Sequence, residues 1–263
     1  MVISFANQKG GVGKTTSAIN VAASLGVLGK KVLLCDLDPQ SNATSGVGVK
    51  QRDLNLSIYD VLIGRCALKE ATIKTDYENL WLLPATIHLA GAEIEFVEEE
   101  TLSVTERFFK FKNNVAEVDH GFDYIIIDCQ PSLGILTVNA LCGSDYVVVP
   151  MQCEYFALEG LFQLSKTIKT IRRNYNPKVD YAGILVTMYD GRLNLSLQIL
   201  DDLKKFFPDK VLKTLVPRAI RLAEAPSYGM PIYYYDRPSR ANECYLELAK
   251  EIDLICAPSA KGV

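Results

Sequence analysis

Long hydrophobic runs are absent from this chain of 263 residues. No apolar stretch approaches the roughly 20 residues that a membrane-spanning helix requires. The N-terminus also lacks the basic region and cleavage site of a secretory signal, and it begins with an apolar segment typical of a β-strand. We therefore expect a cytoplasmic protein.

Paired cysteine motifs and linker segments are absent as well. The seven cysteines are widely spaced, and none forms the C-x-x-C pair typical of zinc and iron–sulfur sites. Most lie in apolar runs, so we expect buried free thiols. No internal repeat, low-complexity tract or Pro/Ser-rich linker divides the chain. We expect residues 1–263 to form a single domain, for which an apolar fraction of 49% supplies a sizeable core.

The charge is nearly balanced in total but unevenly distributed. The chain carries a net charge of −3, whereas residues 166–221 contain 12 basic and 5 acidic side chains, a balance of +7. Such an asymmetry between segments can indicate an anion-binding face. The alternative, basic residues scattered over solvated helix surfaces, is equally compatible with the sequence.

Apolar segments of strand length alternate with helical patterns along the chain. The strand-like segments are continuous apolar runs, as expected where helices cover both faces of a sheet. The sequence therefore predicts an α/β fold with a doubly wound, mostly parallel sheet and helices on both faces. We expect strands at 2–6, 31–36, 80–84, 123–129, 145–150, 181–188 and 210–217, and helices near 14–28, 133–142, 157–174, 194–207 and 239–256, with a long helical stretch after the strand at 80–84 that extends to about 117.

A glycine-rich loop lies between the first expected strand and helix. It is a compressed form of the phosphate-binding loop, and its strand–helix context is the one that this motif requires. Glycines let the backbone N–H groups approach phosphate oxygens at a helix N-terminus. Lys14 is expected to reach the terminal phosphates and Thr15 to ligate Mg²⁺. The expected ATP-binding residues here are Gly10, Gly11, Val12, Gly13, Lys14, Thr15 and Thr16.

A second lysine, Lys9, precedes this loop and has no role in a standard phosphate loop. The stretch KGGVGKT (9–15) resembles the deviant Walker A motif of the ParA/MinD class of P-loop ATPases. The resemblance implies that Lys9 acts across the interface of an ATP-bound homodimer, as an arginine finger does elsewhere. Lys9 and Lys14 are then both catalytic.

Three aspartates lie at the carboxyl ends of expected strands, where ligands bind in open α/β sheets. Asp128 ends an apolar strand and is the expected Walker B carboxylate, which holds Mg²⁺ through water. The resemblance implies that Asp38 positions the attacking water and that Asp36 supports the water shell of the metal. Gln130 departs from the proline usual in this family and puts the hydrolysis rate in doubt.

Longer stretches resemble the Soj/ParA branch, which segregates chromosomes and plasmids. They are DYVVVPMQCEYFALEGL (145–161), ILVTMYDGRLNLS (184–196) and VPRAIRLAEAPSYGMPIYYYD (216–236). The resemblance implies nucleoid association, non-specific DNA binding by the dimer and activation by a ParB/Spo0J-type centromere-binding partner. Arg192 and Arg221 match arginines of the DNA face, and Arg218 lies close enough to share that face or to contact nucleotide.

The surroundings of the adenine and ribose are less sharply indicated. Thr187, Met188 and Pro217 lie at the ends of expected strands on the same sheet edge as the phosphate loop, so they are candidate walls around the base. Glu154 is a candidate contact to the ribose or to the facing subunit. An ordinary structural role is the alternative for each of these residues.

Two other classes of function are compatible with the phosphate loop. A MinD-like positioning ATPase attaches to membranes through a basic amphipathic C-terminal helix, but the end of this chain has acidic residues in its last helix, so no stable membrane attachment is expected. An ATP-dependent ligase resembling dethiobiotin synthetase needs a second-substrate motif, and none is evident.

Overall fold

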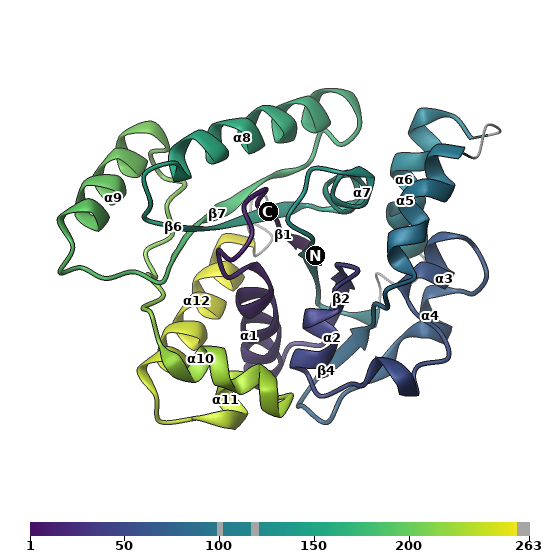
Figure 1. Cartoon of the computed structure of the whole chain (residues 1–263), viewed down its shortest axis with the longest axis horizontal. Helices are drawn as coiled ribbons and strands as arrows, with labels where there is room; N and C mark the ends of the chain where they lie inside the picture. The colour runs from purple at the N-terminus through teal and green to yellow at the C-terminus, as the bar shows by residue number, and fades with distance from the viewer. Residues whose placement is uncertain (99–101, 117–120, 257–263) are drawn as a thin grey trace, which may run out of the picture.

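The structure is a computed structural model that describes residues 1–98, 102–116 and 121–256. A seven-stranded sheet runs through it in the order β3-β4-β2-β5-β1-β6-β7 (Figure 1). Strand β3 pairs antiparallel with β4, and all other pairs are parallel. The strands are β1 (Val2–Phe5), β2 (Val32–Leu37), β3 (Ile73–Lys74), β4 (Leu80–Leu83), β5 (Tyr124–Cys129), β6 (Tyr146–Gln152) and β7 (Asp180–Thr187). The predicted fold class is confirmed.

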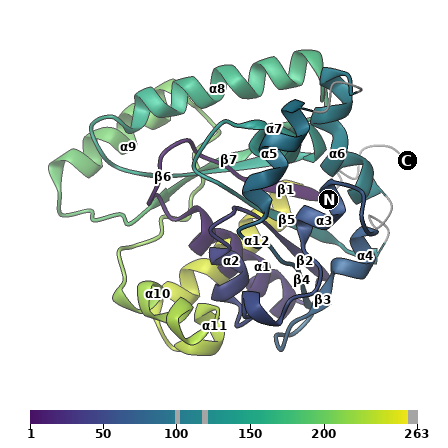
Figure 2. The same cartoon turned by 45° about the vertical axis from the view of Figure 1, so that its right-hand side comes forward.

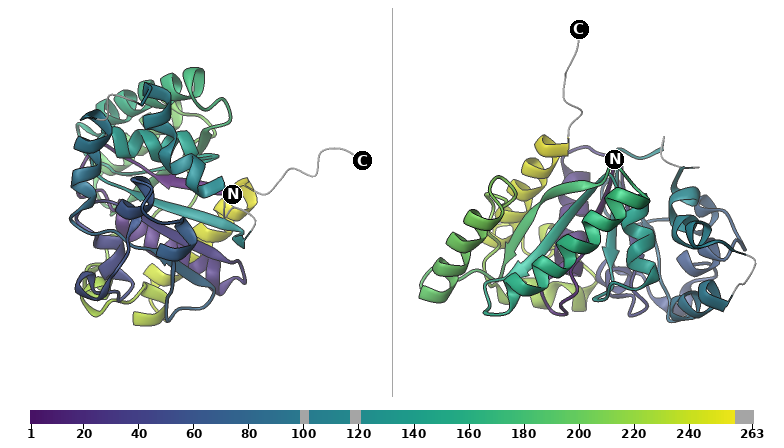
Figure 3. Two further views of the ribbon diagram at one scale, coloured as in Figure 1. Left: turned by 90° about the vertical axis from the view of Figure 1, so that its right-hand side faces the viewer. Right: turned by 90° about the horizontal axis from the view of Figure 1, so that it is seen from above.

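Helices cover both faces of the sheet (Figure 3, left). One face packs against α1 (Lys14–Val27), α2 (Asn42–Gly46), α10 (Ile220–Glu224), α11 (Ile232–Tyr235) and α12 (Arg240–Cys256). The other packs against α3 (Ile58–Leu62), α4 (Leu68–Ala71), α5 (Leu89–Glu98), α6 (Val104–Ala116), α7 (Ile135–Gly143), α8 (Ala157–Asn174) and α9 (Asn194–Phe206). Short 3₁₀ helices lie at Gln51–Asp53 and Ala225–Tyr228.

The continuous apolar runs supply both cores, because successive side chains of a strand point to opposite faces. In β5, Ile125 and Ile127 belong to the core beneath α5–α9, whereas Ile126 belongs to the core beneath α1 and α12. Figures 1 and 2 both place α9 and the group α3–α6 at opposite ends of the molecule. Of the seven cysteines, all are free, and Cys66 and Cys153 are half-buried rather than buried.

The strand expected at 210–217 is wrong. This segment makes only isolated bridges, one between Val211 and Ile184 of β7 and one between Pro217 and Tyr189 beyond the end of β7. The backbone N–H groups of Lys213 and Thr214 donate instead to the carboxylate of Glu251 on α12, at 2.6 and 3.0 Å. These two donors are therefore not available to continue a ladder along β7.

The long helical stretch expected up to residue 117 is divided in two. Helix α5 ends at Glu98, and α6 begins at Val104 after a cap formed by Ser103 and Glu106. Each of these two side chains accepts the backbone N–H of the other, which is the reciprocal pattern of a capping box. Residues 99–101, between the two helices, lie outside the described residues.

The last helix, α12, packs against α1, as expected for a terminal helix buried in the core. Across residues 1–98, 102–116 and 121–256, no helix has the length and apolarity needed to cross a membrane.

Candidate nucleotide and metal site

The phosphate-type loop lies at the carboxyl end of β1, the central strand of the parallel part of the sheet. Two of its residues have positive φ, Gly11 at 74° and Gly13 at 80°, which only glycine adopts readily. Helix α1 starts at Lys14, directly after this turn. The N–H groups in its first turn have no partner within the helix, so the loop and helix terminus together form a cradle for an anion.

Side chains from the segment after β1 and from the strands β6 and β7 hold the loop in this shape. Asn7 donates to the carbonyl of Pro150 at 2.7 Å, and Gln152 donates to the carbonyl of Gly11 at 2.7 Å. The Thr187 hydroxyl donates to the carbonyl of Val12 at 2.8 Å. Sequence reasoning missed Asn7 and Gln152, since nothing in the local pattern shows which distant carbonyls they reach.

Lys14 is buried beneath the loop, and its Nζ donates to the carbonyl of Lys9 at 2.9 Å. Burial lowers the pKa of Lys14, while the nearby Asp128, Cys129 and Asp38 oppose that shift. A lysine in this setting is poorly solvated, so its ammonium group gains strongly from an anion in the loop.

Lys9 points the other way, toward the surface. Its ammonium group forms an ion pair with Glu154, which follows β6. The side chains of Lys9 and Glu154 are 43% and 48% exposed. The structure therefore brings together two residues predicted to be functional, but within one chain rather than across an interface.

Asp36 and Asp128 lie side by side at the ends of β2 and β5, where they are register partners. Both are fully buried. Asp36 accepts hydrogen bonds from the backbone N–H and the hydroxyl of Thr44, both at 2.7 Å, and from the N–H of Asp38 at 3.2 Å. Burial raises the pKa of Asp36 to about 6, despite the opposing effect of the Thr44 bonds. Thr44 is a residue that sequence reasoning missed.

Within the described residues, neither carboxylate oxygen of Asp128 has a hydrogen bond of regular geometry. Burial raises the pKa of Asp128 well above its usual value, the neighbouring Asp36 adds to this shift, and the nearby Thr15 hydroxyl partly opposes it. A buried carboxylate without a partner is costly unless a cation or proton compensates it. Oxygen donors of this kind suit Mg²⁺, so the residues Thr15, Asp36 and Asp128 fit the metal predicted for them.

An apolar cavity of about 350 Å³ adjoins the loop on the side of α1 and α10. Gly13 and Thr16 form its boundary with the loop, and Thr187 and Met188 contribute the end of β7. Pro217, Arg218 and Ile220 close the far side. Thr187, Met188 and Pro217, which were predicted as walls around a base, thus line one cavity. Arg218 lines the same cavity. Glu154 does not line it and contacts Lys9 instead.

Two arginines of the basic segment, residues 166–221, are partly neutralised by nearby acidic side chains. The side chain of Arg192, 89% exposed, binds Asp190 through two hydrogen bonds of 2.9 and 2.7 Å and holds the pKa of that carboxyl at about 2. Arg221 pairs with Glu224 at 3.0 Å and with Asp236 at 3.5 Å. Arg192 lies in the loop after β7 and Arg221 on α10, and a bridge between Tyr189 and Pro217 joins the segments that precede them, so both belong to one region of the surface.

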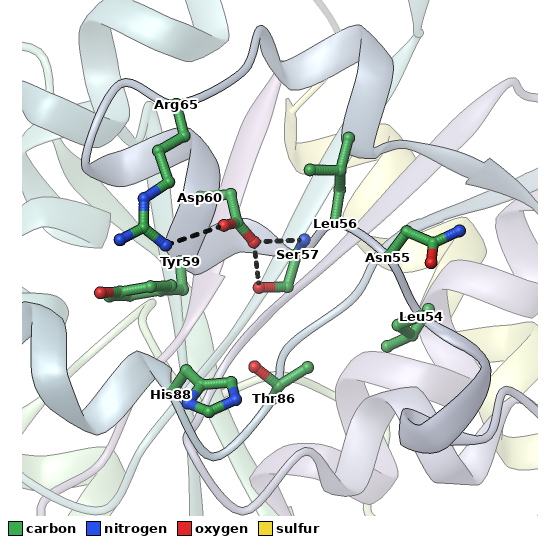
Figure 4. Close-up of a pocket in the computed structure, with 9 residues that line it drawn as sticks. All are labelled: Leu54, Asn55, Leu56, Ser57, Tyr59, Asp60, Arg65, Thr86 and His88. Carbon is green, nitrogen blue, oxygen red and sulfur yellow. Dashed lines mark hydrogen bonds and ion pairs between the residues drawn. The ribbon is translucent and has the colours of Figure 1, made fainter.

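A second, polar pocket lies beside α3 and the β4–α5 loop (Figure 4). Asp60 caps α3 by accepting from Ser57 and also pairs with Arg65 at 3.5 Å. Thr86 lines this pocket, and the preceding residue, Ala85, donates its N–H to the Thr44 hydroxyl at 3.0 Å. One wall of the pocket is therefore connected through Thr44 to Asp36.

Comparison with known proteins agrees with this arrangement. A family profile described as an AAA domain matches residues 1–181. The chain is 51% identical over 251 residues to the sporulation initiation inhibitor protein Soj of Bacillus subtilis, covering 95% of this chain and 97% of that protein. It is 45% identical over 248 residues to the chromosome-partitioning ATPase Soj of Treponema pallidum, covering 94% and 95%.

A solved structure described as cobyrinic acid a,c-diamide synthase from Mycobacterium smegmatis, with bound ADP and magnesium, superposes with a TM-score of 0.82. Its sequence is 36% identical, and the match covers 95% of this chain and 92% of that one. The profile match, the near-complete coverage of the two Soj proteins and the shared fold lead to one conclusion. The chain belongs to the Soj/ParA family of chromosome-partitioning ATPases, within the P-loop class.

Proposed function

We propose that this chain is a Mg²⁺-dependent ATPase whose ATP-bound homodimer binds DNA without sequence preference and partitions DNA. The observation that carries the proposal is the meeting, at one sheet edge, of an anion cradle, the buried Lys14 and the buried carboxylate of Asp128, which has no hydrogen bond of regular geometry among the described residues. A triphosphate with its metal ion satisfies all three at once. Relatives named as partitioning ATPases, and a related structure with ADP and magnesium, support the same assignment.

In this proposal the loop residues Gly10–Thr16 bind the phosphates through backbone N–H groups, and Lys14 binds the terminal phosphate oxygens. The cavity that includes Thr187, Met188 and Pro217 takes the base. Thr15, Asp36 and Asp128 hold Mg²⁺ directly or through water. When bound, the metal spreads the negative charge of the transferred phosphoryl group.

Asp38 is proposed to orient the attacking water. It is buried at the same sheet edge, and its Oδ1 accepts the N–H of Gln40 at 2.9 Å. That bond fixes the orientation of the carboxylate, while Oδ2 has no hydrogen bond within the described part of the chain and can accept one from water. Positioning of this kind accounts for much of the rate in phosphoryl transfer, where the protein does little covalent chemistry.

Lys9 is proposed to act in trans. Its side chain is at the surface beside the loop, so a second copy facing this edge can receive it. Dimerisation would place two basic segments on one assembly, each with Arg192 and Arg221. Lysines and arginines that contact phosphates give DNA affinity that falls steeply with salt. By family membership we further propose nucleoid association and a ParB-type activating partner.

The experiment is a pair of assays on wild type and Asp38→Ala. Phosphate release from ATP is measured with Mg²⁺ and with EDTA, and binding to a random-sequence duplex is followed by fluorescence anisotropy at two salt concentrations. We expect Mg²⁺-dependent hydrolysis in wild type only, and salt-sensitive DNA binding by Asp38→Ala when ATP is present. Equal hydrolysis by both proteins, or DNA binding that is the same with and without ATP, would overturn the proposal.

A further inference from the structure

We infer that Glu154 is a positioning residue that holds Lys9 on its own subunit until a second copy displaces it. The inference deepens the proposed function and depends on it, because it concerns the lysine proposed to act in trans. The ion pair between Lys9 and Glu154 joins residues 145 positions apart, at the rim of the phosphate-type loop. It sets how readily the free chain releases its lysine.

Both residues of this pair are anchored through the backbone, so a change of partner by Lys9 requires only a movement of its side chain. The N–H of Lys9 donates to Asn7 Oδ1 at 3.0 Å, and its carbonyl accepts from Lys14 at 2.9 Å. The four-carbon stem beyond these bonds can rotate without disturbing the loop.

The backbone of Glu154 is held in place between β6 and α8. Its N–H donates to the carbonyl of Gln152 at 2.9 Å, and its own carbonyl accepts from Ala157 at the start of α8 at 3.0 Å. Gln152 in turn donates to Gly11 in the loop at 2.7 Å. The carboxylate therefore stays beside the loop after Lys9 leaves it.

The consequence for assembly follows from charge. For Lys9 to reach a phosphate of the facing subunit, it must exchange a carboxylate for that phosphate. The Glu154 carboxylate then loses its ion pair and receives no cation in exchange, so Glu154 opposes formation of the dimer. Exposed ion pairs are weak, with each worth about 1.4- to 5-fold in an equilibrium constant. Because a dimer breaks two of them, the combined effect is about 2- to 30-fold.

The surface around this pair is suited to cover by a second copy. Tyr155 and Phe156 follow Glu154 directly, are exposed, and pack against each other with ring centroids 5.0 Å apart. Exposed aromatic side chains gathered at one place are typical of protein–protein contact sites.

The test is sedimentation of the full chain with ATP and Mg²⁺, in an Asp38→Ala background that prevents turnover. Glu154→Gln removes the charge and keeps the shape, while Glu159→Gln is a matched control that removes an exposed charge from the first turn of α8. We expect Glu154→Gln to tighten dimerisation about 2- to 30-fold, with the control unchanged. The gain should shrink as salt rises, because salt screens the ion pair that the variant lacks.

Lys9→Ala separates the two hypotheses. If Lys9→Ala abolishes the dimer and Glu154→Gln tightens it, both stand. If Lys9→Ala abolishes the dimer but Glu154→Gln leaves it equal or weaker, the inference fails and the proposed function survives. If Lys9→Ala dimerises as well as its parent, the proposed function itself fails. Adding Glu154→Gln to Lys9→Ala should have no further effect, since there is then no lysine to release. An additive gain in that double variant would contradict the inference.

Discussion

Asp36 and Asp128 are register partners on the adjacent parallel strands β2 and β5, and both carboxylates are fully buried. Asp36 is stabilised by Thr44, but Asp128 has no regular hydrogen bond to any described residue. Burial raises the pKa of both carboxyl groups, and the nearby charge of Asp36 raises that of Asp128 further. The protein without a cation therefore carries an electrostatic cost at this site.

Replacing Asp128 with Asn should stabilise the protein in EDTA, because a neutral amide avoids the cost of the buried carboxylate. We expect the melting temperature to rise by at least about 2 °C, since 1 kcal/mol corresponds to roughly 2–4 °C in chains near this size. The same variant should lose the stabilisation that wild type gains from ATP and Mg²⁺. Asp201→Asn, on exposed surface of α9, is the control and should change neither value. A variant less stable than wild type in EDTA would contradict this electrostatic explanation.

The stability of the apoprotein should also depend on pH through these groups. Their pKa values are raised in the folded state, so the folded chain binds protons more tightly than the unfolded chain. For Asp128, the resulting stabilisation is complete below about pH 4, the pKa range of an unfolded carboxyl, and is lost as the pH rises toward the raised pKa of the folded state. Carboxylates with lowered pKa values have the opposite effect on the pH dependence of stability. The quantity to measure is therefore the difference in the free energy of unfolding between wild type and Asp128→Asn. Urea unfolding in EDTA from about pH 4 to 7 should show the free energy of unfolding of wild type falling progressively below that of the variant. A difference that stays constant with pH would mean that the buried carboxylates are not its cause.

Thr44 should matter for both stability and metal use. Its hydroxyl donates to Asp36 and accepts from Ala85, so Thr44→Val leaves a backbone N–H unsatisfied and Asp36 one bond short. We expect a loss of about 1–3 kcal/mol in the free energy of unfolding. The Mg²⁺ concentration for half-maximal ATP hydrolysis should increase about 10- to 100-fold, as for other residues that orient metal ligands. Thr44→Ser keeps the hydroxyl and should behave nearly as wild type. A Ser variant as impaired as the Val variant would contradict the assignment of these effects to the hydroxyl, because Ser keeps it.

The basic segment offers variants with opposite effects on DNA binding. Arg192→Ala should weaken binding of the ATP-bound protein to a random duplex and reduce the salt slope by about 1, as expected for one lost phosphate contact. Asp190→Asn should strengthen binding, because Asp190 competes with DNA phosphates for the same guanidinium. Arg52→Ala removes an exposed arginine outside this segment and serves as control. If Asp190→Asn weakens binding as Arg192→Ala does, the loop is needed for shape rather than charge.

Much of the fold was predictable because the strands are continuous apolar runs. Asp128 could be placed at the end of a strand from the segment YIIIDC alone, and β5 ends one residue later, at Cys129. Residues 210–217 misled the same reasoning, since the N–H groups of Lys213 and Thr214, in the middle of this apolar segment, are taken by Glu251 on α12. Local pattern does not reveal such competition for donors. The short helices and β3 were not predicted, because they are too short to show a periodic pattern of apolar residues.

The residues of the candidate site likewise fall into those that the sequence predicts and those that only the fold reveals. The loop glycines, Lys14 and the three aspartates are recognisable because their chemistry requires fixed spacing. Thr44 and Gln152 act through single hydrogen bonds to residues brought near only by the fold. The contact between Lys9 and Glu154 is of this second kind, and both residues were predicted to be functional without any indication that they meet.

The most direct test of the proposed trans-acting lysine is the mass of the Asp38→Ala protein by sedimentation equilibrium, with and without ATP and Mg²⁺, compared with the same protein carrying Lys9→Ala. We predict a species of twice the 29.1 kDa chain mass only when ATP is present and Lys9 is intact. A chain that stays monomeric with ATP, or that pairs equally well without the Lys9 ammonium group, would contradict this mechanism.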